Sequence, residues 1–401
     1  MISISEYQKY PCVVLNMAEE IQPLEAPDVH LPQGSTSCSV SAVNTTCYLT
    51  VPGDTLVEPV IRGHEFMNFP TIAFLITHSP TDRRLMFDLG CRKDFWNLPS
   101  PISTTIDDKV PGIKVEKNVS DVLRDGGICL ESLEASIISH HHYDHIGDVT
   151  TFPKSMNLVV GPGFRDAFLP GYPTAQQSPF FEGAFEGRTV QELEFSNSPI
   201  VAGYQAHDYF GDGSLWILNT PGHAVGHISA LVRTANERFI FLGGDICHFG
   251  GSFRPTPYVP MPATLHPDDL GHSDASTPGC LCSAFLACHP DNSRIKPYYR
   301  PCTREDSWYH DPPVASRSIE HLKALDANDN VLVLIAHDPA TLDVLPFFPH
   351  GALDDWYRMG WKRRLRWRFL LELPIGEKPQ EFLVPGTFKE GKLVKLINRA
   401  D

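Results

Sequence analysis

Residues 139–148 read SHHHYDHIGD, and this stretch decides what the chain folds into. Three histidines and one acid stand at fixed places in it, which is rare by chance in a chain of 401 residues with 18 histidines. Neutral imidazole and carboxylate are ligands that suit zinc. The apolar run 135–138 directly before the stretch predicts a short buried strand. We therefore predict a metal-binding loop after this strand, with the candidate ligands His140, His142, Asp144 and His145.

Three further donors follow other apolar runs. His223 lies in TPGHAVGH, Asp245 in LGGDICH and His337 in LIAHDP, each just after a predicted strand. Loops at strand ends commonly carry functional side chains on a rigid scaffold. A site with two metal ions at ~3.5–4 Å needs more ligands than the first stretch supplies. The pattern therefore predicts that these three side chains join the first four.

The remaining pattern indicates sheets covered by helices. Strands are predicted at 38–51, 71–77, 84–89, 135–138, 158–160, 214–218, 228–232, 239–242 and 331–335. The second and third of these runs are separated by a turn-rich segment and predict a hairpin. Helices are predicted at 119–124 and at about 316–325. Strands in a meander, followed by strands that alternate with helices, are typical of a mixed α/β (α+β) fold.

Domain organisation follows from composition. Residues 1–37 are Pro-rich and weakly patterned, so we predict an N-terminal arm followed by a single domain over 38–401. Residues from about 250 to 312 lack periodicity and predict a long loop insertion over the core. Four cysteines gather there, but their spacing is not that of a zinc ribbon. Incidental or buried thiols are favoured over a third metal site or a disulfide for Cys280, Cys282, Cys288 and Cys302.

The order HxHxDH, PGHxxGH, GD and AHD over about residues 38–345 resembles the metallo-β-lactamase superfamily. In detail it is similar to the lactonase branch, typified by bacterial N-acyl-homoserine lactonases, and to fungal members that open lactones or lactams. The resemblance implies a four-layer αββα sandwich and two divalent metal ions, most readily zinc. It assigns His140, His142 and His223 to the first ion, Asp144, His145 and His337 to the second, and Asp245 to both.

The resemblance also implies a reaction. A water that bridges two such ions is acidified and gives hydroxide at neutral pH, which attacks the carbonyl carbon of a lactone, a lactam or a related small ester or amide. Asp144 would orient this nucleophile and shuttle its proton. The ligands alone do not choose zinc over iron or manganese.

His248 marks a departure from the family pattern. Homoserine lactonases carry a tyrosine three residues after the bridging aspartate, and here that position is His248. One interpretation is catalytic, because a histidine there could donate a hydrogen bond to the substrate carbonyl or protonate a leaving group. The other is structural, with His248 capping a turn. The sequence leaves both open and argues against an acyl-homoserine lactone as the substrate.

Other residues support the predicted site. Asp88 in FDLG is expected to orient the histidine loop, with a turn-forming Asp before Gly as the alternative. His227 is expected to be a buried, hydrogen-bonded histidine, while His141 and Tyr143 should point away from the metals or line the mouth of the site. Two aromatic groups could wall a pocket or pack in the core: Phe66, Met67 and Phe69, and Phe180, Phe181 and Phe185.

A thioesterase or glyoxalase-II-like hydrolase on the same scaffold is the alternative function. Glutathione-linked or carrier-linked substrates usually need basic residues near the site. The chain shows no obvious basic cluster. The candidates for this role are Arg254, Arg294, Lys296, Arg300 and Arg304.

Composition limits the partners. The formal net charge of −15 argues against nucleic acid, and the basic stretch 362–368 is interpreted as an amphipathic element with a solvated face. The N-terminus lacks the pattern of a signal peptide, and no run reaches the ~20 apolar residues of a membrane span. We therefore expect a cytoplasmic enzyme for a small-molecule substrate, without membrane partners and with reduced cysteines. The oligomeric state is left open.

Overall fold

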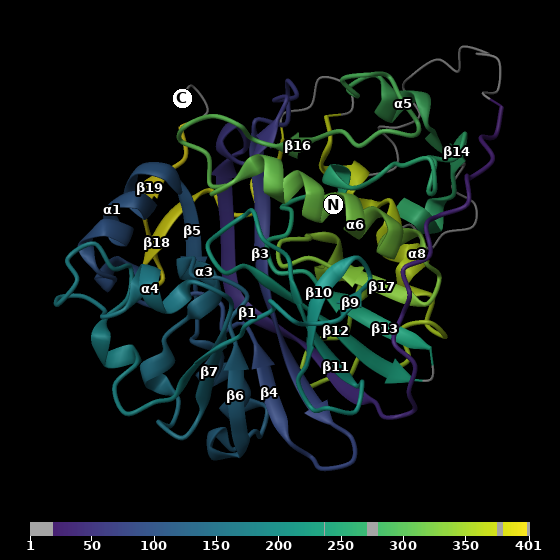
Figure 1. Ribbon diagram of the computed structural model, residues 1–401. Coiled ribbons are helices and arrows are strands. Elements are labelled where there is room, and N and C mark those ends of the chain that lie inside the picture. The colour runs from purple at the N-terminus through teal and green to yellow at the C-terminus, as the bar shows by residue number, and fades with distance from the viewer. Residues whose placement is uncertain (1–18, 236, 271–279, 375–379, 399–401) are drawn as a thin grey trace.

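The structure is a computed structural model that describes residues 19–235, 237–270, 280–374 and 380–398. Its main feature is a pair of β-sheets packed face to face (Figure 1). The first sheet has nine strands, in the spatial order β19 (Lys392–Leu396), β18 (Gly386–Lys389), β5 (Gly112–Val115), β1 (Cys38–Pro52), β3 (Phe66–His78), β4 (Arg84–Phe87), β6 (Leu133–Ile137), β7 (Asn157–Val160) and β8 (Val190–Glu192). The second has six strands, in the order β17 (Val331–Leu334), β13 (Arg238–Leu242), β12 (Ile228–Ala235), β11 (Leu215–Asn219), β10 (Tyr204–Asp208) and β9 (Ile200–Val201).

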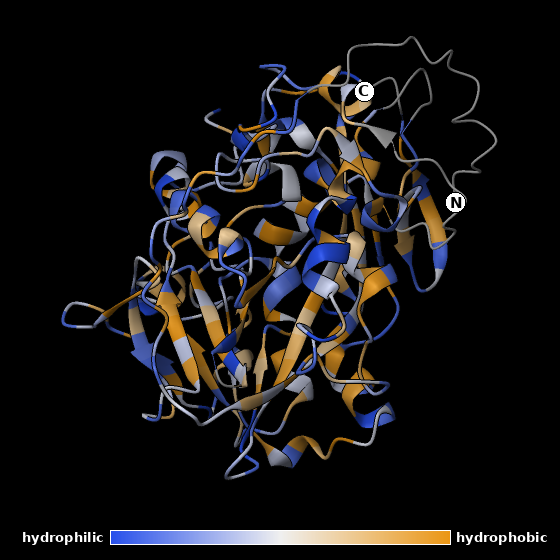
Figure 2. Cartoon of the chain, turned by 90° about the vertical axis from the view of Figure 1, so that its right-hand side faces the viewer, coloured by the Kyte–Doolittle hydropathy of each residue, from blue (hydrophilic) through white to orange (hydrophobic). Residues whose placement is uncertain are grey.

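Side chains from both sheets fill the space between them. Val40 and Ala42 of β1 and Ile76 of β3 pack in one apolar cluster with Ile217 of β11 and Ile240 of β13, and each of these side chains is buried. Successive residues of a strand point to opposite sides of the sheet. The second face of the first sheet is buried as well. Figure 2 shows that apolar residues dominate the strands, whereas hydrophilic residues are frequent on the surrounding helices and loops.

Helices cover the outer face of each sheet. Helix α2 (Val119–Asp125) buries Leu123 in a cluster with Leu75 of β3. Helix α6 (Pro312–Ala327) buries Leu322 in a cluster with Phe241 and Val333 of the second sheet. The other α-helices among the described residues are α1 (Ser100–Lys109), α3 (Tyr143–Ile146), α4 (Phe164–Phe168), α5 (Ser283–Leu286), α7 (Ala340–Val344) and α8 (Trp361–Arg366). The predicted helix–sheet–sheet–helix layering is therefore confirmed.

The predicted elements match in position, with several boundaries displaced, and β3 begins five residues before its predicted start. Strands β3 and β4 pair antiparallel as the predicted hairpin. Helix α6 begins four residues before the predicted start, because prolines at its first positions are compatible with a helix N-terminus. The Asp311 side chain caps it by accepting a hydrogen bond of 3.0 Å from the Val314 amide. Helix α6 links β13 to β17, which then pair in parallel.

The segment 250–312 crosses the top of the molecule in Figure 1. Its described part contains only short elements, among them β14 (Thr264–Leu265), β15 (Cys280–Leu281) and β16 (Arg300–Pro301), which pairs with β2 (Val57–Glu58). Of the clustered cysteines there, Cys282 and Cys302 are buried free thiols and Cys288 is a half-buried one, as expected, while the side chain of Cys280 lies outside the described residues. Residues 19–37 of the predicted arm form no helix or strand, and residues 1–18 lie outside the described part.

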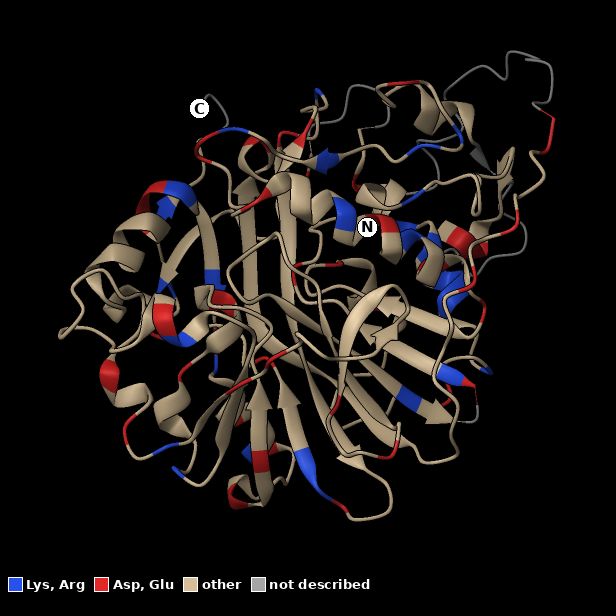
Figure 3. Ribbon diagram, viewed as in Figure 1, with Lys and Arg blue, Asp and Glu red and all other residues tan. Residues whose placement is uncertain are grey.

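No helix within the described residues combines the length and the apolar character that a membrane crossing requires. Charged side chains lie mainly on loops and helices at the periphery, and the strands carry few of them (Figure 3).

The prediction for the basic stretch 362–368 is wrong at one residue. The stretch forms α8 and the turn after it, and Arg363 is exposed as expected, but Lys362 is buried. Its ammonium group donates hydrogen bonds to three backbone carbonyls, those of Asp326 at 2.7 Å, Asn328 at 2.7 Å and Val331 at 2.6 Å. These carbonyls belong to the end of α6, to the turn that follows it and to the first residue of β17. Lys362 therefore stabilises the connection between α6 and β17 by three hydrogen bonds.

Replacing Lys362 by methionine should lower the free energy of unfolding by about 3 kcal/mol, because three buried carbonyls lose their donor. The matched control is Arg363→Gln, which removes only exposed ion pairs with Asp268 and Asp269 and should cost at most about 1 kcal/mol. Urea denaturation of the two variants measures the difference. Equal stability of the two variants would show that Lys362 does not fasten the turn.

Candidate metal centre

The loop after β6 is held by Asp88. The Ser139 amide donates to Asp88 Oδ1 at 2.7 Å, and the Ser139 hydroxyl donates to Asp88 Oδ2 at 2.8 Å. His145 Nδ1 lies 2.8 Å from the same Oδ2 atom. Asp88 itself has a φ of 63°, a conformation that few non-glycine residues adopt. The expectation that Asp88 orients the histidine loop is confirmed, and its contact with Nδ1 leaves Nε2 of His145 to face the other donors.

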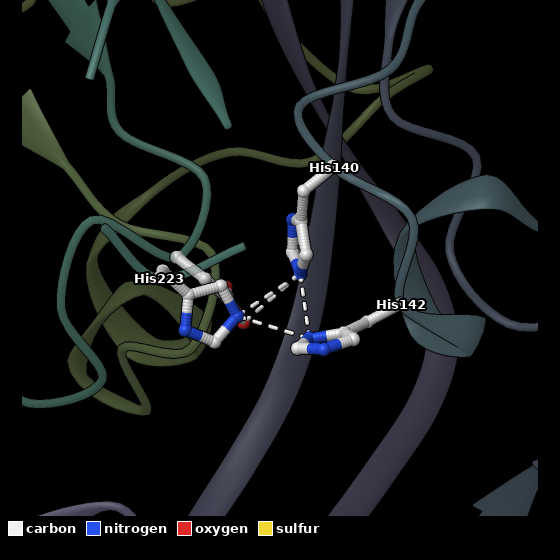
Figure 4. Close-up of side chains that lie close together, drawn as sticks. His140, His142 and His223 are labelled. Carbon is white, nitrogen blue, oxygen red and sulfur yellow. Dashed lines mark hydrogen bonds and ion pairs between the residues drawn. The ribbon is translucent and has the colours of Figure 1, made fainter. Parts of the chain in front are cut away.

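Three histidines turn one nitrogen each to a common point (Figure 4). The distances are 2.9 Å from His140 Nε2 to His142 Nδ1, 2.9 Å from His142 Nδ1 to His223 Nε2, and 3.2 Å from His223 Nε2 to His140 Nε2. Burial lowers the pKa of all three imidazoles well below the ordinary value, so each is neutral. His140 Nδ1 lies 3.0 Å from the Ser139 hydroxyl, which leaves Nε2 free to face this point.

A second group of donors lies beside the first. It contains Asp144 and His145 of α3 and His337, which follows β17. Asp144 Oδ2 is 3.5 Å from His337 Nε2 and 3.9 Å from His145 Nε2. His337 Nδ1 is 3.1 Å from the Pro70 carbonyl oxygen, to which it donates, so its Nε2 faces the carboxylates. In each group the ligand atoms lie within 4.8 Å of one another.

Asp245 connects the two groups. Its Oδ2 atom lies 3.7 Å from His140 Nε2 and 3.5 Å from His223 Nε2. Its Oδ1 atom lies 3.2 Å from both His145 Nε2 and His337 Nε2. The structure thus brings all seven predicted donors together at one edge of the two sheets.

The donor set fits divalent metal ions. His145 Nε2 and Asp245 Oδ1 are buried and lie 3.2 Å apart, but among the described residues neither atom forms a hydrogen bond of acceptable geometry. Burial alone would lower the pKa of His145, but the carboxylates of Asp245, Asp88 and Asp144 outweigh it and raise the pKa well above the ordinary value. Burial likewise disfavours the charged form of His337, yet Asp245 raises its pKa. The same negative charges that favour a proton on these rings favour a cation between them, and nitrogen and carboxylate donors suit zinc.

Glycine at position 222 lets the chain bring His223 into place. Gly222 has a φ of 127°, and a Cβ atom there would lie 2.1 Å from the Ala315 nitrogen of α6. The carbonyl groups of residues 222 and 223 accept hydrogen bonds from the segment just before that helix. The His310 amide donates to the His223 carbonyl and the Asp311 amide donates to the Gly222 carbonyl, both at 2.8 Å.

His227 holds the backbone of Asp245 by a hydrogen bond. The Asp245 amide donates to His227 Nε2 at 3.0 Å, and His227 Nδ1 lies 2.9 Å from the Thr220 carbonyl oxygen, to which it donates. Burial lowers the pKa of His227 to about 4, so it is neutral and can accept at Nε2. The expectation of a buried, hydrogen-bonded His227 that is no ligand agrees with these contacts.

A narrow cavity of about 30 Å³ opens onto the donors. Apart from donor residues, its walls are apolar or aromatic and hold no Lys, Arg or Glu among the described residues. They include Leu49, Val51, Leu56, Phe69, Val110, Tyr143 and Trp308. Phe69 thus lines the site, whereas Met67, from the same predicted group, packs in the core.

Two of the other aromatic candidates line a neighbouring cavity. Phe180 and Phe181 line it together with His141 and Tyr143, which is shared between the two cavities. His141 stacks on Phe168 at 4.3 Å between ring centroids and lines this second cavity, not the one at the donors. This agrees with the expectation that His141 is no ligand.

His248 faces the donors. Its Nε2 atom lies 3.3 Å from Asp245 Oδ2, and its Nδ1 atom lies 3.0 Å from the Tyr309 hydroxyl. The ring is buried and lines the cavity. Burial raises the pKa of the Tyr309 phenol well above the ordinary value, so the hydroxyl keeps its proton. The ring therefore faces the cavity that the donors line.

Sequence reasoning missed Trp308 and Tyr309. Trp308 packs edge-on against His142 at 5.4 Å between ring centroids, and Tyr309 packs against His223 at 5.2 Å. Both lie at the end of the segment 250–312, where the sequence shows no periodicity. The signal available was an aromatic pair just before a helix N-cap, and it does not reveal what the rings contact.

The basic residues that a thioester substrate would need are engaged elsewhere. Arg254 is buried and paired with Asp326 at 2.5 Å. The other four pair with acids away from the cavity, and none of the five lines it: Arg294 with Glu20, Lys296 with Asp291, Arg300 with Glu58, and Arg304 with Asp54 and Asp306.

Known proteins are similar in sequence to this chain over most of its length. The family model described as "Metallo-beta-lactamase superfamily" matches residues 68–275. Gamma-lactamase FDB1 of Fusarium pseudograminearum is 40% identical over 352 residues, which cover 86% of this chain and 84% of that protein. Cytochrome P450 monooxygenase mpaDE of Penicillium roqueforti is 33% identical over 88% of this chain, but the chain spans only 39% of the length of that protein.

The fold also has solved relatives. A crystal structure of a quorum-quenching N-acyl homoserine lactone lactonase superposes with a TM-score of 0.50 at 16% identity, covering 79% of this chain and 99% of that one. At this identity the likeness concerns the fold alone. The family match and the 40% identical relative show that the chain is a metal-dependent hydrolase of the metallo-beta-lactamase superfamily.

Proposed function

We propose that the chain binds two zinc ions and uses them to open a lactam or lactone ring by hydrolysis. The observation that carries this proposal is the carboxylate of Asp245, whose two oxygens face different groups of donors at 3.2–3.7 Å. One shared carboxylate between two donor groups suits a pair of ions rather than one. The proposed ligands are His140, His142 and His223 for one ion, Asp144, His145 and His337 for the other, and Asp245 for both.

Two zinc ions held there would supply an acidified water as the nucleophile and polarise the carbonyl under attack. Asp144 and His248 contribute the chemistry of the protein itself. Asp144 Oδ2 holds the proton that hydroxide attack releases and passes it to the ring nitrogen or oxygen when its bond to the carbonyl carbon breaks. Its position 3.5 Å from His337 Nε2, inside the donor cluster, supports this role.

His248 donates a hydrogen bond from Nε2 to the carbonyl oxygen of the substrate, where negative charge develops during attack. The cavity lining and the short distance of this nitrogen from Asp245 support that placement. Donors that are fixed before the reaction stabilise such charge without reorganisation.

The cavity walls suggest the substrate class. Apart from the proposed zinc ligands, the described residues of the lining include no Lys, Arg, Asp or Glu, which favours a small, uncharged, largely apolar ring over a charged thioester conjugate. The name of the 40% identical relative, a gamma-lactamase, supports a cyclic amide. A thioester of glutathione or of a carrier is the second candidate, but the basic residues considered for it are paired elsewhere.

Freshly purified protein should contain ~2 zinc ions per chain by elemental analysis. Chelation should abolish hydrolysis, and added zinc should restore it. The variants His142→Ala and Asp245→Asn should fall below about one hundredth of wild-type turnover, because loss of even an outer partner of a metal ligand costs 10- to 100-fold. Circular dichroism checks that both variants fold. Near-normal turnover of either variant would contradict the ligand assignment.

Ring-opening should exceed thioester cleavage in a substrate panel. We expect turnover of γ-decalactone or N-phenylpyrrolidinone, measured by chromatography of the ring-opened acid. We expect little turnover of S-lactoylglutathione, because the described residues that line the cavity include no Lys or Arg. The zinc-loaded Asp245→Asn variant is the background control. If only the thioester is cleaved, the proposal of a lactone or lactam substrate is wrong.

Replacing His248 by alanine should lower kcat about 100- to 1,000-fold, the usual cost of removing one hydrogen-bond donor to a developing oxyanion. The zinc content should stay near that of the wild type, because His248 is not among the proposed ligands. Steady-state kinetics and elemental analysis on the same preparation measure both. Unchanged kcat would leave His248 with a structural role only.

A further inference from the structure

The ring of His248 is packed on several sides by other rings. It stacks against Phe69 at 5.8 Å and against His337 at 6.1 Å between centroids, and it meets Tyr309 and His223 edge-on at 5.2 Å and 4.7 Å. Such packing fixes the plane of the imidazole. It does not distinguish the ring from the same ring flipped by half a turn, because the flip exchanges nitrogen for carbon at nearly the same volume.

The hydrogen bond to Tyr309 makes that distinction. Only the observed orientation places a nitrogen, Nδ1, at 3.0 Å from the Tyr309 hydroxyl. No other hydrogen bond to this hydroxyl is found within the described part of the chain. A buried hydroxyl without another acceptor donates its proton to the nitrogen it faces. Nδ1 then accepts, and the single proton of a neutral imidazole resides on Nε2, which lies 3.3 Å from the Asp245 carboxylate.

We propose that Tyr309 is a positioning residue, whose phenol O–H holds His248 in the orientation and tautomer that aim Nε2–H into the cavity. The inference rests on the proposed function, in which that N–H stabilises charge on the substrate carbonyl oxygen. Tyr309 acts only through His248 and does not itself need to touch the substrate.

The segment that carries Tyr309 is firmly placed. The Trp308 amide donates to the Thr55 carbonyl at 3.0 Å, and the Tyr309 amide donates to the Ser307 hydroxyl at 3.1 Å. The next residue, His310, donates its amide to the His223 carbonyl. The phenol is therefore fixed relative to one of the proposed zinc ligands, and this is the condition under which one hydrogen bond can orient a ring.

The chain contains a matched pair that does not serve the site. Tyr299, from the same segment, places its hydroxyl 2.6 Å from His64 Nδ1, and both rings are buried. Neither residue lines the cavity at the donors. Tyr299→Phe therefore removes the same kind of buried Tyr–His hydrogen bond as Tyr309→Phe, without a catalytic partner.

The test compares zinc-loaded wild type, Tyr309→Phe and Tyr299→Phe on γ-decalactone and N-phenylpyrrolidinone. We expect Tyr309→Phe to lower kcat about 10- to 100-fold with KM changed less than about 2-fold, as for other partners that orient a catalytic group. Tyr299→Phe should stay within about 2-fold of wild type in both constants. Equal kcat values for the two variants would overturn the proposal.

The same substitution in the His248→Ala background tests whether Tyr309 acts through His248. Tyr309→Phe should then cause no further loss, because its partner is already gone. A further loss as large as in the wild-type background would show that Tyr309 acts elsewhere and would overturn the proposal.

A readout without substrate separates this inference from the proposed function. Proton–nitrogen correlation spectra of the imidazole nitrogens, with His248 assigned by its absence in His248→Ala, should show the Nε2–H tautomer in zinc-loaded wild type and in Tyr299→Phe. In Tyr309→Phe the tautomers should mix. An Nδ1–H tautomer in the wild type overturns the inference, whereas failure to open either ring in the presence of the expected tautomer overturns only the proposed function.

Discussion

The carboxylate of Asp245 faces two groups of donors at once, and this arrangement depends on how the two sheets pack against each other. His140 and His145 follow a strand of the first sheet, whereas His223 and His337 follow strands of the second. The distances of 3.2–3.7 Å around Asp245 therefore hold only if the sheets keep one relative position. The apolar layer between them, with Ile76 of one sheet against Ile240 of the other, supplies that constraint.

Unusual backbone conformations at two positions, Asp88 and Gly222, help to place the donors. Asp88 adopts a left-handed φ, and the hydrogen bonds that it accepts from Ser139 and His145 offset this cost. Gly222 allows the loop of His223 to approach the N-terminus of α6 more closely than a side chain would permit. Strained residues near functional groups are common, because the surrounding contacts can hold them there.

Much of the fold and of the donor cluster was predictable because its signals are local. Apolar runs of strand length mark β1, β3, β6, β11 and β13, and each donor follows such a run within a few residues. Where the determining contact is distant in sequence, the prediction was wrong or silent. Lys362 is buried where its ammonium group meets three backbone carbonyls of the connection between α6 and β17. Nothing within the stretch 362–368 indicates that these carbonyls are there. Tyr309 likewise depends on contacts that lie far along the chain: its hydroxyl faces His248, and the amides of the next two residues, His310 and Asp311, donate to the carbonyls of residues 223 and 222.

The contact between His248 and Tyr309 joins positions that are 61 residues apart. Loss of either side chain alone leaves the other with a buried polar atom and no partner, at a cost of about 1–3 kcal/mol. Such a cost makes single exchanges at these two positions less tolerable than a joint exchange. Descendants of this sequence should therefore keep or replace the two rings together, so that selection on one position slows drift at the other.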